Sequence, residues 1–124
     1  MRTRHEQNVS ERTVTLEVRS LAATLGDLAQ TLATGEASAP RIAFATPALL
    51  FKLLTQKRWE LLAAMTGSGP VSVRAAARLV GRDVKSVHGD VQTLIKAGIL
   101  EKTAAGRIVF PYSAIHVDFT LKAA

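Results

Sequence analysis

Two short amphipathic patterns separated by a glycine constrain this sequence more than any other feature. Apolar residues recur at helical spacing over residues 72–80 and again over residues 84–96. Gly81 provides the turn between them, Asp83 stands where the N-cap of the second helix belongs, and Gly98 follows its last turn as a C′ glycine. We therefore predict two short helices joined by a tight turn.

The residues that follow the second helix predict a β-hairpin. Residues 99–103 and 107–110 have the pattern of two short strands around a turn at residues 104–106, and Val71 is expected to add a further short strand beside them. Helix, turn, helix and hairpin is the order of a winged helix-turn-helix, which is a DNA-binding module.

Basic and polar side chains fall on the outward faces and turns of this predicted motif. In helix-turn-helix proteins the start of the second helix meets base edges, and Arg82 and Lys85 stand there. Basic residues on the first helix and on the hairpin are placed to meet phosphates. Asp90 would repel a phosphate, so we expect it to orient a neighbouring arginine. The expected DNA-binding residues are Ser72, Arg74, Arg78, Arg82, Lys85, Ser86, Gly89, Lys96, Lys102 and Arg107.

The net charge of +6 is concentrated in the same region. Residues 1–40 carry four basic and five acidic side chains, residues 41–70 carry four and one, and residues 71–110 carry seven and three. A basic surplus on the outward side of this motif favours duplex DNA as a partner. The near-neutral first third of the chain suits a basic protein better than a phosphate backbone.

Alternating patterns near both ends of the chain predict β-strands. One covers residues 12–19, with its apolar residues on one side, and the other covers residues 115–121. Because an unpaired edge strand promotes unwanted association, we expect these two strands to pair with each other or across a dimer.

A helix with a leucine stripe is expected from about residue 21 to residue 34. The stripe either joins the core of its own chain or packs on a second subunit, and the pattern leaves both open. Residues 35–40 have the composition of a linker, and residues 1–11 are expected to be disordered. The stripe consists of Leu21, Leu25, Leu28 and Leu32.

The middle of the chain predicts a short strand at residues 41–44 and helical structure over residues 47–65. Thr46 followed by a proline is a good helix start, and Thr55 is placed to cap the second part of the helical segment. The pattern does not decide whether this segment is one bent helix or two. The inward side of its second part is expected to carry Trp59, Leu62 and Ala63.

Residue patterns typical of enzymes and metal sites are missing. The sequence has no cysteine, and His5, His88 and His116 have no ligand spacing. Ser86, His88 and Asp90 cannot form a triad, because on a helix the middle residue points away from the other two. We therefore expect no catalytic, metal or cofactor site. We also expect no membrane span and no signal peptide, and a cytoplasmic location.

Several segments resemble a group of small MarR-like winged-helix regulators of bacteria and archaea. The segments that carry the resemblance are residues 55–62, 71–74, 81–91, 107–112 and 115–119. The sequence departs from the group where its members tend to have larger side chains, at Ala75, Ala76 and Gly89.

Members of this group often look like antitoxins paired with a small toxin of the TumE type. The resemblance therefore implies a homodimeric DNA-binding repressor that also binds a cognate toxin, as antitoxin and autorepressor of a toxin–antitoxin operon. We expect an α+β fold with an N-terminal strand-helix extension at residues 1–40, for dimer or partner binding. A winged helix-turn-helix DNA-binding domain would follow at residues 41–124 and end in a C-terminal strand. The alternative is a winged-helix module that binds protein without contacting DNA directly.

Overall fold

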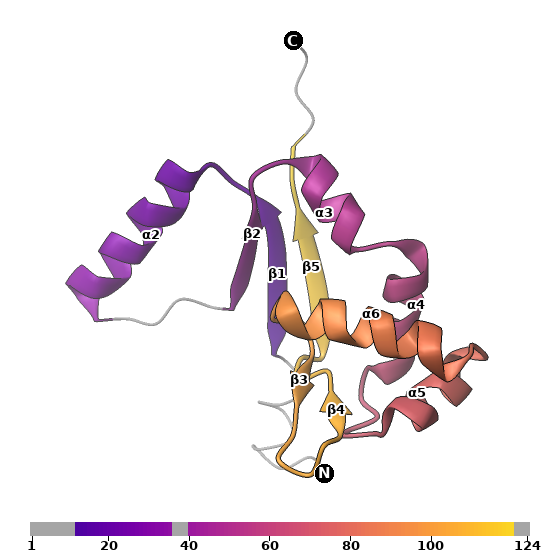
Figure 1. Ribbon diagram of the computed structural model, residues 1–124. Coiled ribbons are helices and arrows are strands. Elements are labelled where there is room, and N and C mark those ends of the chain that lie inside the picture. Colours follow the sequence, from indigo (N-terminus) through magenta and orange to yellow (C-terminus); the bar gives the residue numbers. More distant parts are fainter. Residues whose placement is uncertain (1–11, 36–39, 121–124) are drawn as a thin grey trace, which may run out of the picture.

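A parallel β-sheet and four helices surround one hydrophobic core in the computed structural model, which describes residues 12–35 and 40–120 (Figure 1). The predicted α+β fold class is confirmed. The elements are β1 (Thr13–Val18), α2 (Leu21–Thr34), β2 (Arg41–Phe44), α3 (Pro47–Leu53), α4 (Gln56–Met65), α5 (Val73–Val80), α6 (Val84–Lys96), β3 (Glu101–Lys102), β4 (Ile108–Val109) and β5 (Ala114–Asp118).

The sheet has the strand order β2-β1-β5, and both outer strands run parallel to β1. Leu16 is in register with Ile42 on one side and with Val117 on the other. Val14 and Leu16 are fully buried in the core that the sheet shares with α3 to α6. The two terminal strands thus pair within one chain, which was one of the two predicted arrangements. Leu121, the expected end of the last strand, lies outside the described residues.

Residues 47–65 form two helices rather than one bent helix. Thr46 and Thr55 are the N-caps of α3 and α4, and each hydroxyl oxygen accepts a hydrogen bond from a backbone N–H three residues later. Leu54 lies between them with φ −94° and ψ 69°, which is not a helical conformation. The chain therefore changes direction there and starts a new, separately capped helix.

The predicted inward side of α4 is partly wrong. Trp59 and Ala63 are exposed, whereas the buried side chains of the helix are Leu61, Leu62 and Met65. The predicted side and the buried side of α4 share Leu62 and are neighbours on the helix surface. The orientation in the structure buries the long side chains of Leu61 and Met65 in place of Trp59 and Ala63. Trp59 consequently lies at the protein surface with 44% of its area exposed.

The predicted helix-turn-helix is formed by α5 and α6. Gly81 has φ 66° and ψ 34°, a left-handed conformation that glycine adopts without steric cost, and it ends α5. Asp83 caps α6 through a hydrogen bond from the Ser86 N–H at 2.9 Å. Gly98 follows the C-cap residue Ala97 of α6 and has φ 85°, as expected for a C′ glycine. These local signals explain why both helices begin and end where the sequence predicted.

A short antiparallel hairpin of β3 and β4 follows α6. Glu101 is in register with Val109, and the strands are shorter than predicted. The expected third strand is reduced to a bridge: the N–H of Val71 donates to the carbonyl of Ile108 at 2.9 Å, and the reverse hydrogen bond is 2.8 Å long. Val71 therefore fastens the start of α5 to the hairpin, as the sequence indicated.

The N-terminal helix α2 has the predicted bounds but leaves three leucines of its stripe in water. Leu25, Leu28 and Leu32 have 54%, 55% and 76% of their areas exposed, and none belongs to the core. In Figure 1, α2 lies beside β2, away from the other helices. Most of the linker before β2 (36–39) and residues 1–11 lie outside the described residues. In the described part of the chain, no helix is long and apolar enough to cross a membrane.

Candidate nucleic-acid interface

The second helix of the helix-turn-helix, α6, has one buried face and one exposed polar face. Val87, Val91 and Leu94 are fully buried. In Figure 1, α6 runs across the molecule, with α5 near its first turn and the hairpin below its last turn. Eight of the ten predicted DNA-binding residues are exposed, and only Ser72 and Arg82 are half-buried.

Gly89 lies in the middle of the exposed face of α6. A Cβ atom added at this position would meet no atom within 4 Å, so no contact inside the chain requires a glycine. The hydroxyl of Thr93 donates to the carbonyl oxygen of Gly89 at 3.1 Å, one turn later. No side chain covers the helix backbone at Gly89, so the backbone itself can approach a ligand closely.

The first turn of α6 is capped by a charged group. Hydrogen bonds from the Ser86 N–H, and from its side chain, hold the pKa of Asp83 below the usual value of an aspartate. The carboxylate therefore satisfies one of the free N–H groups at the helix start, that of Ser86. Lys85 lies in the same turn and is exposed.

The preceding helix α5 presents two arginines one turn apart. Arg74 and Arg78 are both exposed, whereas Ala76 and Ala77 are buried against the core. Ser72 caps this helix by accepting a hydrogen bond from a backbone N–H at 3.0 Å, so its hydroxyl oxygen has a structural role.

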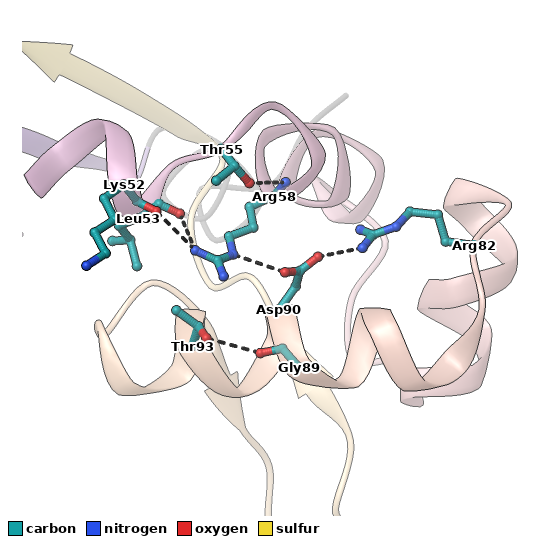
Figure 2. Close-up of polar contacts among 8 residues, drawn as sticks. All are labelled: Lys52, Leu53, Thr55, Arg58, Arg82, Gly89, Asp90 and Thr93. Atoms are coloured by element: carbon teal, nitrogen blue, oxygen red, sulfur yellow. Dashed lines mark hydrogen bonds and ion pairs between the residues drawn. The ribbon is translucent and has the colours of Figure 1, made fainter. Parts of the chain in front are cut away.

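Arg82 differs from the other predicted DNA-binding residues because it is tied to α6 itself. Its Nη2 lies 2.8 Å from Oδ2 of Asp90, and 17% of the Arg82 side chain is exposed (Figure 2). The contact is an ion pair between the guanidinium group and the carboxylate. Arg82 Nη1 is buried and has no hydrogen-bond partner in the described structure.

Asp90 also binds a second arginine, which the sequence did not single out. Arg58 Nε donates to Asp90 Oδ1 at 3.0 Å, and Arg58 Nη1 donates to the carbonyl oxygens of Leu53 and Lys52 at 2.9 and 3.3 Å (Figure 2). The expectation that Asp90 orients a neighbouring arginine is confirmed for both. Through this cluster the end of α3, the first turn of α4 and the middle of α6 are held together.

The hairpin carries the remaining two cations. Lys102 lies on β3 and Arg107 directly precedes β4, and both are exposed. Thr103 holds the turn, because its N–H donates to the carbonyl of Arg107 at 2.8 Å and its hydroxyl accepts from the Arg107 N–H at 3.1 Å. Gly106, with φ 80°, completes the tight turn.

One of the three carboxylates in residues 71–110 is neutralised inside the protein. Asp90 is half-buried and paired with two arginines, whereas Glu101 and the capping residue Asp83 are exposed. Among the described residues, no group of acidic, histidine or cysteine side chains could hold a metal ion.

Comparison with known proteins gives one family. No curated protein and no solved structure matches the sequence. The sequence model of the HVO_A0114 family matches residues 53–117, which include α4, α5, α6, the hairpin and most of β5. Because the matched residues make up more than half of the chain, this protein belongs to the HVO_A0114 family.

Proposed function

We propose that this protein is a sequence-specific transcriptional regulator that binds double-stranded DNA with α6 in the major groove. The observation that carries the proposal is the division of α6 into two faces. One is buried in the core, and the other exposes Lys85, Ser86, Gly89 and Lys96, while the carboxylate of Asp90 in the same helix is paired with two arginines. A helix of this kind fits the width of the major groove.

The exposed cations divide into two roles in this proposal. Lys85 and Ser86 stand in the first turn of α6, where helix-turn-helix proteins contact base edges. Arg74 and Arg78 on α5 would meet phosphates on one side, and the hairpin cations would meet the backbone on the other. Phosphate contacts supply affinity and register, whereas the first turn of α6 supplies sequence preference.

Arg82 and Asp90 would act mainly by holding α6 in position. The pair lies between the helix-turn-helix turn and the rest of the domain, and its carboxylate is shared with Arg58. A fixed helix orientation is needed for base contacts, because a bidentate contact depends on the placement of the side chain. The buried Nη1 of Arg82 is a donor that a phosphate could reach only if the side chain turned outward.

The resemblance to antitoxins extends the proposal to an operon. The protein would repress its own toxin–antitoxin operon as a homodimer and bind the toxin separately. The exposed leucines of α2 support a partner-binding role for this helix, because soluble proteins rarely expose a contiguous apolar stripe without use. Completion of the dimer is a second use of the same helix.

The direct test compares Lys85→Ala and Arg74→Ala on cognate and scrambled duplexes over a range of salt concentrations. The first variant should lose preference for the cognate duplex, by about 1–3 kcal/mol if a good base contact is removed. The second should weaken binding to both duplexes and lower the salt slope by about one unit. Lys52→Ala is the matched control, because Lys52 is exposed on α3, outside the helix-turn-helix.

The result that would contradict the proposal is a parent protein without affinity for its own upstream DNA, or two variants that bind as the parent does at every salt concentration. In either case α6 would be better explained as a surface for protein binding.

A further inference from the structure

The strand β5 forms one edge of the sheet. It pairs with β1, and no strand in the described chain lies on its other side. Edge strands present unpaired backbone N–H and C=O groups and serve as templates for pairing with another chain. β5 carries no proline or lysine that would prevent such pairing. Its residues Ala114, His116 and Asp118 are exposed.

The five residues from Ile115 to Phe119 are chemically symmetrical about Val117. Ile115 and Phe119 are apolar at the two ends, and His116 and Asp118 flank the centre as a donor and a carboxylate. Side chains alternate along a strand, so the three apolar residues share one side and the two polar residues share the other. A strand with this order is complementary to itself when it is turned around.

We propose that β5 pairs antiparallel with β5 of a second copy of this chain, with the two Val117 residues opposite each other across a two-fold axis. Each Ile115 then faces Phe119 of the second copy, and each His116 faces Asp118 of the second copy. Two sheets of three strands would become one continuous sheet of six. Such an interface is isologous, as in most homodimers, and it pairs the β5 edge of each copy with that of the other.

Charge favours this register over the neighbouring ones. A shift that centres the pair on His116 places Asp118 opposite Ala114, so both histidine–carboxylate pairs are lost. A shift that centres the pair on Asp118 places two carboxylates opposite each other. Like charges directly across a strand pair are destabilising. Asp118 is also in register with Glu17 of β1, so it already has one carboxylate neighbour and would gain a donor from His116 of the second copy.

The apolar side of the proposed interface would cover exposed aromatic residues. A pocket of about 190 Å³ next to β5 is lined by Trp59, Leu62, Ala63, Thr66, Phe110 and Ile115. Phe119 is 39% exposed and its ring packs edge-to-face on Phe51, with a centroid distance of 5.3 Å. In the proposed register, Phe119 of the second copy lies over Ile115 at the rim of this pocket. The exposure of Trp59 and Phe119 in the single chain is thereby explained.

Charge exchange tests the register in the full-length protein. His116→Asp places like charges opposite each other at two symmetrical positions, and Asp118→Lys removes both carboxylates. Each should raise the dimer dissociation constant about tenfold or more. The double variant carrying both changes should restore dimerisation, because the carboxylate introduced at position 116 would face the ammonium group introduced at position 118 in both pairs. An equimolar mixture of the single variants should form heterodimers, measured by sedimentation velocity with one variant labelled.

The control is Ala105→Asp, which adds the same charge at an exposed position in the turn between β3 and β4, away from β5, and should leave the dimer intact. Circular dichroism melting checks that each variant is folded. The proposal is overturned if the parent is monomeric at tens of micromolar, if His116→Asp dimerises as the parent does, or if the double variant stays as weak as the single ones. These readouts use no DNA, so the failure of this interface and the failure of the proposed DNA binding are distinguishable.

Discussion

Arg82 Nη2 and Asp90 Oδ2 lie 2.8 Å apart, so the arginine in the turn before α6 is bound to a carboxylate nearly two turns along that helix. The pair is mostly shielded from water, with 17% and 15% of the side chains exposed. A contact of this kind stiffens the helix-turn-helix turn. The stability of the domain therefore depends on Arg82, which the sequence pattern predicts to bind DNA.

Arg82→Ala should therefore lower stability as well as DNA binding. Loss of a mostly shielded ion pair, with the second arginine still in place on the carboxylate, is expected to cost about 1–2 kcal/mol. Urea denaturation of the variant measures the loss. Lys85→Ala is the matched control, because Lys85 is exposed in the same turn and its removal should change stability by less than about 0.5 kcal/mol. Equal stability of the two variants would argue against a positioning role.

Asp90→Asn should be more damaging than Arg82→Ala. The aspartate is shared by Arg58 and Arg82, so its neutralisation leaves two partly buried guanidinium groups without their counter-charge. A loss of about 2–3 kcal/mol is expected. The double variant with Arg82→Ala should be less destabilised than the sum of the two single changes, because both remove the same contact. Additive losses in denaturation midpoints would contradict the coupling.

The sequence predicted local structure well because the signals for it are local. The caps Thr46, Ser72 and Asp83 and the left-handed Gly81 and Gly98 act within one helical turn, and the structure has all five in those roles. Strand alternation likewise predicted both terminal strands, but it left open whether they pair with each other or across a dimer. Caps, turns and the presence of a strand need no knowledge of distant residues, whereas strand pairing does.

Features that depend on tertiary placement were missed or left open. Arg58 stands in a run of polar residues on α4 that has the appearance of a solvated face, and only the approach of α6 supplies its partner. The rotation of α4, which exposes Trp59, goes with the packing of Leu61, Leu62 and Met65 in the core that several distant elements share. The predicted boundary between the N-terminal extension and the DNA-binding domain, at residue 40, separates β1 from β2, although these two strands pair with each other. Tests of the N-terminal segment therefore require substitutions rather than truncation.

Gly89→Ala should separate stability from DNA binding. Alanine is a better helix former than glycine by about 1 kcal/mol, and its methyl group would meet no atom of the chain within 4 Å. We expect a more stable protein that binds its cognate duplex less tightly, because the methyl group would keep the backbone away from the groove. Thermal melting and fluorescence anisotropy measure the two effects. As a control, Gly81→Ala should destabilise the protein, because φ is 66° at that position. Unchanged affinity of Gly89→Ala would show that the backbone makes no close approach.

Asp83 should contribute to acid sensitivity. Its pKa is lowered in the folded protein by the hydrogen bonds from Ser86, so the stabilisation is fully present above the unfolded-state pKa and is lost as the pH falls through the lower folded value. Asp83→Asn keeps a capping side chain but does not titrate. The stability difference between parent and variant should therefore be constant at neutral pH and shrink in the acidic range. A difference that does not vary with pH would mean that the charge of the cap is unimportant.

The exposed leucines of α2 should matter for partners and not for the fold. A double change of Leu28 and Leu32 to Gln removes apolar area that is largely in water already, so the free energy of unfolding should change by less than about 0.5 kcal/mol. By contrast, Leu94→Ala in the buried face of α6 should cost about 2–5 kcal/mol. If α2 binds the cognate toxin, the double variant should bind the operator as the parent does but fail to capture the neighbouring gene product on co-expression. Light scattering on the same variant tests the other use of the helix. Because α2 lies beside β2 and not beside β5, the proposed β5 interface predicts that the variant remains dimeric. A monomeric variant that still captures the neighbour would contradict that interface and would place dimer formation in α2 and partner binding elsewhere.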